Sequence, residues 1–314
     1  MAKASSTLNK RGGAHTAEAA HGLVIAAHGR HFTVELPDGS LRMCYPRGKK
    51  SDAAVGDRVE ILPQGLDEGV IQRVHERRNL LYRSDEMRTK QFAANVDQLL
   101  IVVAPEPAFS DDLLGRALVA ARAIDLDALI VLNKADLAAS LPDAQRRLTH
   151  LADGGVPVIA LSALSPDDVA TQLLPRLQGR CSLLLGQSAM GKSTLLNALV
   201  PEAQARTQAH SQALGAGRHT TTSTRLYHLP DGVGDIIDSP GFQAFGLNHL
   251  TPAEIEHGFP EFTEPAEHCR FYNCTHRHEP GCGVLAALAS GRIKPERHAL
   301  YQRILEENET QQRY

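Results

Sequence analysis

Short runs in which apolar and polar residues alternate occupy the first part of the chain. They lie at 22–27, 31–36, 41–45, 57–62 and 69–74. Alternation with a period of two is typical of half-buried strands, and about five short strands at this spacing favour a small barrel of the OB type. We therefore expect an all-β domain over 21–76. Residues 1–20 carry mostly small, polar and basic side chains and predict a disordered tail.

The pattern then changes to longer apolar runs separated by helical stretches. The expected strands are 96–104, 127–133, 156–163, 180–186, 224–229 and 233–238, and the expected helices are 111–124 and a segment ending at about 178. Strands this apolar between helices indicate a sheet covered on both faces, a doubly wound, mostly parallel α/β domain over 95–249. The basic stretch 77–94 predicts a solvated linker.

Composition limits the classes of function. The 314 residues are enough for two or three domains, 42% are hydrophobic and no Trp is present, so aliphatic side chains must form the core. A net charge of −3 does not fit a protein that merely coats nucleic acid, so such contacts would come from local basic patches. No apolar run is long enough for a membrane span or a signal-peptide core, which favours a cytoplasmic protein with no membrane partner.

Residues 250–314 are expected to form a small zinc-binding helical domain that ends in a charged helix near 295–309. Within it, 269-CRFYNCTHRHEPGC-282 has the spacing C-x4-C-x-H-x5-C. Three thiolates and one imidazole in so short a segment suit tetrahedral Zn²⁺, and closure by four protein ligands favours a structural ion. His268 or His278 could substitute for a ligand. The predicted ligands are Cys269, Cys274, His276 and Cys282.

The stretch 186-GQSAMGKS-193 follows a strand, precedes an amphipathic helix and matches G-x-x-x-x-G-K-[ST]. Glycines in such a P-loop let the backbone wrap phosphate oxygens, and the helix N-terminus adds N–H groups and partial positive charge. We predict that Lys192 bridges the β- and γ-phosphates and that Ser193 ligates Mg²⁺. The pattern alone does not distinguish ATP from GTP. The predicted nucleotide contacts are Gly186, Gln187, Ser188, Ala189, Met190, Gly191, Lys192, Ser193 and Thr194.

The base is predicted to be recognised by 133-NKAD-136, which ends a strand. A carboxylate at Asp136 can accept from both N1–H and the N2 amino group of guanine, whereas adenine presents no such pair of donors. Asn133 would brace the loop, and the stem of Lys134 would lie against the purine. Beside a P-loop, this motif favours GTP and GDP as the ligands.

Weaker signals complete the predicted nucleotide site. Backbone N–H groups of Ser162 and Ala163 would meet guanine O6. Asp238, in the run DSPG, is placed to reach Mg²⁺ through water, and the N–H of Gly241 would meet the γ-phosphate. The run 217-GRHTTTSTR-225 lies where switch I belongs, and one of its threonines would complete the Mg²⁺ shell. The candidate is Thr221, with Thr220 and Thr222 left open.

These motifs stand in an unusual order. The base motif precedes the P-loop, as in a GTPase whose chain has been cut and rejoined elsewhere, and parallel sheets tolerate such circular permutation when the old termini lie close together. With a barrel before it and a Cys/His segment after it, the chain from about residue 21 onward closely resembles the ribosome small-subunit-dependent GTPase A (RsgA) family. The permuted order, the zinc-type spacing and the runs GRHTTT and DSPGF carry the resemblance. Ala189 and Met190 depart from it, because many relatives have Gly and Val there.

The resemblance implies a function. It implies a Mg²⁺-dependent GTPase that acts in late maturation of the small (30S) ribosomal subunit, binds 16S rRNA near the decoding region and leaves in the GDP form. It also implies slow intrinsic hydrolysis, stimulation by the subunit and ordering of switch I by rRNA. The four predicted zinc ligands match those of the family, and we expect a monomer.

Hydrolysis must proceed without the glutamine that orients water in Ras-like enzymes. Phe242 occupies that place, and Gln243 would point away on a strand-like path. The resemblance makes His219 the candidate for positioning water, in its neutral form, the alternative being that it only caps a loop. Lys192, Mg²⁺ and backbone N–H groups are expected to stabilise the transferred phosphoryl group.

Basic runs on both sides of the expected α/β domain, before residue 95 and after residue 250, favour an RNA partner. Each run alone is typical of a solvated face, but barrels and zinc modules both bind RNA. Two other functions stay open: a non-hydrolysing, nucleotide-gated RNA-binding protein, which Phe242 favours, and an ATP-dependent RNA-processing enzyme, which Asp136 disfavours. The basic positions are 42–50, 292–303, Arg73, Arg77, Arg78, Arg83, Arg88 and Lys90.

Overall fold

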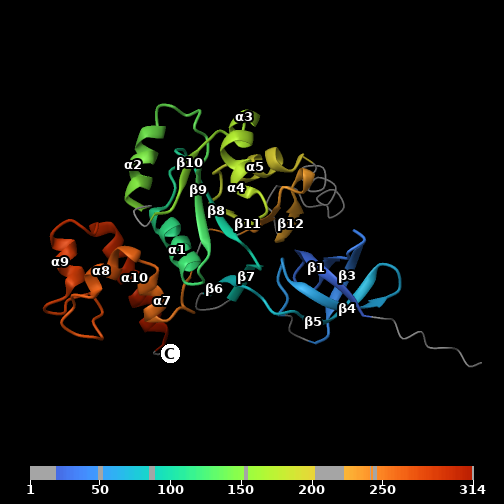
Figure 1. Cartoon of the computed structure of the whole chain (residues 1–314), viewed down its shortest axis with the longest axis horizontal. Coiled ribbons are helices and arrows are strands. Elements are labelled where there is room, and N and C mark those ends of the chain that lie inside the picture. Colours follow the sequence, from blue (N-terminus) through green and yellow to red (C-terminus); the bar gives the residue numbers. More distant parts are fainter. Residues whose placement is uncertain are drawn as a thin grey trace, which may run out of the picture.

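The computed structural model describes residues 19–48, 52–84, 89–151, 155–201, 223–240, 242 and 246–312, without the side chains of 83, 84, 89, 90, 150, 311 and 312. The barrel and the C-terminal helices lie at opposite ends of the molecule, with the α/β part between them (Figure 1). No described helix is long and apolar enough to cross a membrane. Several predicted residues fall outside the described ranges: His219, Thr220, Thr221, Thr222, Gly241 and Gln243.

Five strands form a closed barrel at the N-terminal end. They are β1 (Ala20–Ala27), β2 (Phe32–Glu35), β3 (Leu41–Pro46), β4 (Arg58–Gln64) and β5 (Glu68–Val74). The pairings run β1–β2–β3–β5–β4 and back to β1, with only β3 and β5 parallel. Alternate residues such as Val24, Val34 and Ile61 are fully buried and form the barrel's core. The predicted all-β barrel is confirmed.

The stretch that follows the barrel is a β-hairpin, so the prediction of a solvated linker there is wrong. β6 (Leu80–Ser84) and β7 (Thr89–Ala94) pair antiparallel, with Leu80 opposite Ala94. Leu81 and Phe92 are almost completely buried and anchor the two strands. Basic residues dominate the sequence pattern here, but two short apolar clusters on either side of a charged stretch are typical of a hairpin.

The central part is a sheet with helices on its faces (Figure 1). Its strands are β8 (Gln98–Val103), β9 (Asp127–Leu132), β10 (Val158–Ala160), β11 (Cys181–Gly186), β12 (Arg225–His228) and β13 (Asp235–Asp238). They are ordered β10-β9-β8-β11-β13-β12, and all but β12 run parallel. Every residue of β8 is buried, as expected for a strand covered on both faces. The predicted strands and their mostly parallel arrangement are confirmed.

The helices of this part are short. They are α1 (Asp111–Arg122), α2 (Leu141–Leu151), α3 (Pro166–Asp168), a π-helical turn (Val169–Leu173), α4 (Leu174–Leu177), α5 (Lys192–Leu199) and a 3₁₀ turn (Pro230–Gly232). The sequence interpretation contained no helix at the position of α2. Ala144, Leu148 and Leu151 nevertheless follow helical spacing and are buried against the sheet domain's core.

The C-terminal part is a compact set of helices built around aromatic rings. It consists of α7 (Pro252–His257), a 3₁₀ turn (Pro260–Phe262), α8 (Thr263–Ala266), α9 (Gly283–Ala289) and α10 (Pro295–Gln312). Tyr301 of α10 meets Phe259 and Phe262 edge-on, with ring centroids 5.4 and 5.1 Å apart. Thr251 and Glu254 cap α7 reciprocally, with Pro252 in its first turn.

Helix α10 packs closely on α1 of the sheet domain. A Cβ atom at Gly115 would lie 2.2 Å from Leu300 Cδ2, so the close approach of the two helices requires glycine there. Arg116 donates to both carboxylate oxygens of Glu307 at 2.7 Å, and also to Asp112 at 2.7 Å. The Arg116 side chain is only 9% exposed, so these ion pairs are part of the packed interface.

The barrel joins the sheet through a shared strand edge. Ala26 of β1 pairs with Arg225 of β12, which makes one sheet of eleven strands. A second contact lies at the barrel's corner, where Gly56 has φ of 92° and a Cβ atom would lie 2.1 Å from Ala94 O. A tight turn therefore forms this corner and packs against β7.

Candidate functional site

The predicted P-loop connects the end of β11 to the start of α5. Gly191 has φ of 86° and Ala189 has φ of 66°, both left-handed conformations. α5 begins at Lys192, and Ser193 and Thr194 in its first turn are exposed. Because the first N–H groups of a helix lack intrahelical partners, this loop presents donors suited to an anion.

Lys192 and Asp238 form an ion pair at this loop. Asp238 ends β13 and is 3% exposed, and it lies opposite Leu184 in the parallel pairing of β11 with β13. The register of two neighbouring strands thus brings together the predicted phosphate-binding lysine and the predicted Mg²⁺-directed carboxylate.

Asn133 links the base motif to the P-loop. Its Nδ2 donates to Met190 O at 3.0 Å, and its Oδ1 accepts from the Ala163 N–H at 2.9 Å. A Cβ atom at Gly191 would lie 2.2 Å from Asn133 Nδ2, so this link needs glycine at 191. Asn133 is 2% exposed and joins three of the predicted nucleotide-binding segments.

Asp136 faces a cavity of about 440 Å³. Ser162 Oγ donates to Asp136 Oδ1 at 2.6 Å and so fixes the orientation of the carboxylate. Next to it, Lys134 has φ of 59° and its Nζ donates to Glu106 O at 2.7 Å. The cavity is of a size that accommodates a small ligand. It is lined by Ala135, Asp136, Ser162, Leu164, Ser165 and Asp168.

The backbone N–H groups of Ser162 and Ala163 already have protein partners. Ser162 N–H donates to Asp168 Oδ2 at 3.0 Å, and Ala163 N–H donates to Asn133. The contact of these groups with guanine O6 stays a prediction. It would require at least one of the two donors to exchange its partner for the base.

Two supporting contacts were not predicted from the sequence. Ser110 N–H, at the N-cap of α1, donates to Gln187 Oε1 at 2.6 Å, which holds the P-loop from the side. Thr224 Oγ1 lies 3.0 Å from Ser239 Oγ, and both residues are buried. Thr224 lies in the run 217–225, the predicted switch I, and the Thr-rich sequence of that run was the local signal for it.

The four predicted zinc ligands converge on one point. Their ligand atoms all lie within 4.8 Å of one another. Cys282 Sγ is 3.8 Å from Cys269 Sγ and 3.4 Å from His276 Nδ1. A tetrahedron with the usual zinc distances has S–S edges of about 3.8 Å and S–N edges of about 3.6 Å. Cys269, Cys274, His276 and Cys282 could therefore hold zinc, and no other such group occurs in the part of the chain that the structure describes.

Neighbouring groups shape this candidate metal site. The N–H groups of Gly283 and Leu285 approach Cys269 Sγ and Cys282 Sγ at 3.3 and 3.4 Å, as donors do to metal-bound thiolates. Glu279 accepts from the N–H and hydroxyl of Thr275. Although burial alone would raise it, these and nearby backbone hydrogen bonds hold the pKa of Glu279 far below its usual value. The carboxylate thus organises the ligand loop as an anion.

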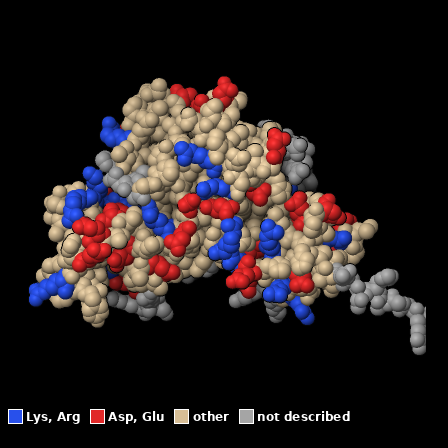
Figure 2. Space-filling model, in the orientation of Figure 1, with Lys and Arg blue, Asp and Glu red and all other residues tan. Residues whose placement is uncertain are grey.

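Many of the predicted RNA-binding arginines are engaged within the protein. Arg77 pairs with buried Asp57 at 2.7 Å, and Arg297 pairs with Glu261 at 2.6 Å. Acidic and basic side chains are interspersed over the face in Figure 2, without one continuous basic surface. On this face an RNA contact would therefore use separate patches. Further pairs are Arg78–Asp97, Arg292–Glu264 and Arg303–Asp112.

The fold and the motif order define a class, the circularly permuted GTPases. The crystal structure of YloQ, described as a circularly permuted GTPase, matches 95% of this chain and 97% of its own with a TM-score of 0.67 at 27% identity. The crystal structure of YjeQ from Thermotoga maritima matches 93% of this chain and 99% of its own with a TM-score of 0.70 at 32% identity.

Sequence comparison gives the family. The RsgA GTPase family model matches residues 74–248. A Bordetella pertussis protein named small ribosomal subunit biogenesis GTPase RsgA is 68% identical over 92% of this chain and 96% of its own length. A Burkholderia pseudomallei protein of the same name is 59% identical over 92% of this chain and 93% of its own. The chain belongs to the RsgA GTPase family.

Proposed function

We propose that this chain is a Mg²⁺-dependent GTPase that acts in biogenesis of the small ribosomal subunit. The observation that carries the proposal is the link through Asn133, which joins a guanine-type base motif to a P-loop in one site. Family membership supports the same activity, because the relatives are named as small ribosomal subunit biogenesis GTPases. GTP is the substrate, and GDP and phosphate are the products.

Each part of the site has a proposed role. Asp136 accepts from guanine, with Ser162 holding its carboxylate. The backbone from Gly186 to Thr194 surrounds the phosphates, and Lys192 moves from Asp238 to the β- and γ-phosphates. Mg²⁺, when bound, would neutralise phosphate charge. Ser193, Asp238 and Thr221 are the proposed residues around it, and the N–H of Gly241 is proposed to meet the γ-phosphate.

Hydrolysis is proposed to rely on His219 to position water. Phe242 stands where a Ras-like enzyme has glutamine; the residue is 4% exposed, and its ring has no polar group that could orient water. A neutral imidazole can orient a water molecule for attack on the γ-phosphorus. Slow turnover by the protein alone is expected, with faster turnover when the subunit orders switch I.

We also propose that Cys269, Cys274, His276 and Cys282 hold one structural zinc ion. The edge lengths of the ligand cluster fit tetrahedral coordination, and four protein ligands leave no open position. Metal analysis of the purified protein should give one zinc per chain, and Cys274→Ser should lower the midpoint of thermal unfolding. A metal content near zero in folded protein would contradict this proposal.

The proposed partner is the small ribosomal subunit with its 16S rRNA. The protein is proposed to work in the cytoplasm as a monomer and away from membranes. The barrel and the C-terminal helices lie at opposite ends (Figure 1), so they could contact separate parts of a large particle. RNA binding should weaken as salt rises, because phosphate contacts release counterions.

The test compares GTP and ATP hydrolysis with and without isolated small subunits. We expect slow GTP turnover that rises about tenfold or more with subunits, and no ATP turnover. Asp136→Asn should weaken GTP binding and favour xanthosine triphosphate, because an amide offers a donor to the xanthine 2-oxo group. Tight GTP binding without turnover under either condition would instead indicate the alternative, a non-hydrolysing, nucleotide-gated RNA-binding protein.

A further inference from the structure

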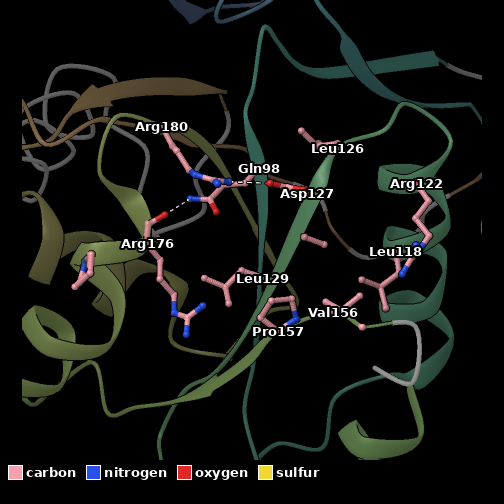
Figure 3. Close-up of a pocket in the computed structure, with 13 residues that line it drawn as sticks. Gln98, Leu118, Arg122, Leu126, Asp127, Leu129, Val156, Pro157, Arg176 and Arg180 are labelled. Atoms are coloured by element: carbon pink, nitrogen blue, oxygen red, sulfur yellow. Dashed lines mark hydrogen bonds and ion pairs between the residues drawn. The ribbon is translucent and has the colours of Figure 1, made fainter.

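One cavity outside the nucleotide site is braced by contacts within the protein. It has a volume of about 520 Å³ and is lined in part by Gln98 and Asp127, the first residues of β8 and β9. Arg180 Nη1 donates to Asp127 at 2.9 Å, and Gln98 Nε2 donates to Arg176 O at 2.8 Å (Figure 3). These contacts join segments that are 53 and 78 residues apart, so these polar side chains serve to hold the walls of the cavity together.

A second cavity, on the surface of the barrel, brings two histidine rings together. Its volume is about 740 Å³, and it lies where β1 and β4 begin and β2 ends. His21 is exposed and His75 is partly exposed, so both imidazoles are accessible to solvent. The lining includes His21, Leu23, Leu36, Arg58, Val59 and His75.

The strand register explains how the two histidines meet. His21, the second residue of β1, lies opposite Glu60 of β4. β5 pairs with the other side of β4, and His75 directly follows β5, with its backbone N–H donating to Arg58 O at 2.9 Å. The two imidazoles therefore come from either side of β4 and lie 54 residues apart in the chain. No local spacing in the sequence indicates such a pair.

The separation of the two rings fits a shared metal ion. His21 Nδ1 and His75 Nε2 are 3.3 Å apart, and the ring centroids are 5.4 Å apart, so the rings face each other through these nitrogens. Hydrogen bonds from an N–H group usually span about 2.7–3.2 Å, which makes this pair slightly long for one. Two Zn–N bonds of about 2.0–2.1 Å at the tetrahedral angle place their nitrogens about 3.3–3.4 Å apart. One zinc ion could therefore bind both nitrogens without a change in their separation.

The charged groups around the pair balance one another. Glu60 lies directly opposite His21, and Arg73 lies directly opposite Glu60 on β5, so all three share one face of the sheet. In total, three carboxylates stand beside three basic groups, which leaves no excess of positive charge to repel a cation. Imidazole nitrogens are ligands that suit zinc, copper and nickel. The acidic groups are Glu35, Glu60 and Asp235, and the basic groups are Arg58, Arg73 and His228.

We propose that His21 and His75 bind one zinc ion at a site separate from the cysteine cluster. His21 Nδ1 and His75 Nε2 supply two ligands in their neutral forms, and water from the open cavity completes the shell. Two protein ligands hold zinc less tightly than four, so this site fills after the cysteine cluster. A bound ion joins the start of β1 to the segment that leaves the barrel after β5, and so stabilises the barrel by mass action.

The test uses the full chain, first equilibrated with one equivalent of zinc so that the tighter cysteine cluster is filled. Excess Mg²⁺ is present, because it prefers oxygen ligands and occupies sites built of carboxylates alone. Zinc is then titrated by calorimetry, and we expect wild type to bind one further ion per chain. His21→Ala and His75→Ala should each raise the Kd of this ion at least about tenfold, because each removes one of its two protein ligands.

His257→Ala is the matched control variant, because His257 is an exposed histidine of α7 that lies near Asp125, outside the cavity. It should leave the Kd of the further ion unchanged. Equal Kd values for wild type, His21→Ala and His75→Ala would overturn the proposal, as would absence of a further ion at millimolar zinc. An equal loss of affinity in His257→Ala would also overturn it, because the binding would then not be specific to this pair.

Chemical modification gives a second measurement that does not depend on the variants. Diethyl pyrocarbonate acylates imidazole nitrogens that are free, and mass spectrometry of peptides locates the modified residues. Zinc beyond the first equivalent should protect His21 and His75 and leave His257 reactive. Equal modification of His21 and His75 with and without this zinc would show that the two rings only contact each other and would contradict the assignment.

Discussion

The backbone N–H of Ala27 donates to the carbonyl oxygen of Thr224 at 3.1 Å. Ala27 ends β1 of the barrel, and Thr224 lies near the end of the run 217–225, the predicted switch I. The Thr224 hydroxyl in turn lies 3.0 Å from that of Ser239, in the run DSPG that is predicted to approach Mg²⁺ and the γ-phosphate. Thr224 therefore contacts the barrel through its backbone and the DSPG run through its side chain. The barrel is thus connected to two of the segments predicted to surround Mg²⁺.

The hydroxyl pair between Thr224 and Ser239 should contribute to stability. Thr224→Val keeps the shape but leaves the Ser239 hydroxyl buried without this partner, so we expect a loss of about 1–3 kcal/mol in the free energy of unfolding. Ser239→Ala should cost a similar amount, and the double variant clearly less than the sum. Urea unfolding of all four proteins measures this. Strictly additive losses would show that the hydroxyls do not interact.

Gly191→Ala should disrupt nucleotide binding. The added Cβ atom would lie 2.2 Å from Asn133 Nδ2 and would separate the base motif from the P-loop. We expect the Kd for GDP to rise at least about tenfold, equivalent to about 1.4 kcal/mol. Gly179→Ala is the control, because Gly179 also has positive φ, at 69°, but has open space around it. It should lose comparable stability and keep its GDP affinity.

Ala189→Gly should stabilise the protein. Ala189 has φ of 66°, a conformation that costs a residue with a Cβ atom about 1 kcal/mol and glycine almost nothing. The free energy of unfolding should therefore rise by up to about 1 kcal/mol. Ala198→Gly, at an exposed position inside α5, should lower it by about the same amount. If both variants lose stability, the left-handed conformation at 189 is not strained.

His228 should give the stability a dependence on pH. It bridges the barrel and the sheet, with Nε2 2.7 Å from Glu35 and Nδ1 2.7 Å from Asp235. Burial would lower the pKa of His228, but these two carboxylates raise it overall. A folded-state pKa above the unfolded value gives stabilisation that is complete below about pH 6.5 and is lost as pH rises through the folded pKa.

Chemical unfolding of wild type and His228→Ala over a pH series measures this effect. The difference in the free energy of unfolding should be larger at about pH 6 than at about pH 9. Glu35→Gln removes one carboxylate and keeps the imidazole, so it should reduce the pH dependence without abolishing it. A difference that grows as pH rises would contradict the assignment.

The sequence predicted the parts of the site that are contiguous in the chain. The P-loop and the NKAD run are short motifs, and the four metal ligands lie within 14 residues, so local spacing was enough to identify them as candidates. The contacts that hold these motifs join distant segments. Asn133 and Met190 are 57 residues apart, and Ser110 and Gln187 are 77 apart. No local pattern encodes such pairs.

Charged residues misled the interpretation of one segment. Basic residues between the barrel and the sheet suggested a solvated linker, but Leu81 and Phe92 pack a hairpin there. Arginines such as Arg77 and Arg297 favoured an RNA partner; each also pairs with a carboxylate on another segment, and the RNA contact stays a prediction. Charge in a sequence indicates solvent exposure only on average, because long side chains can bury their stems and pair their heads.

The bidentate pair between Arg116 and Glu307 spans 191 residues. During synthesis, α1 emerges long before α10. Arg116 and the packing surface at Gly115 can therefore make their contacts only after α10, the last helix of the described chain, has been made. Until α10 has been made, the face of α1 that carries Gly115 and Arg116 has no packing partner. α1 is also the helix whose N-cap residue, Ser110, donates to Gln187 of the P-loop. A nascent chain that already carries the P-loop and the NKAD run therefore still lacks the packing partner of α1, the helix that this hydrogen bond joins to the P-loop.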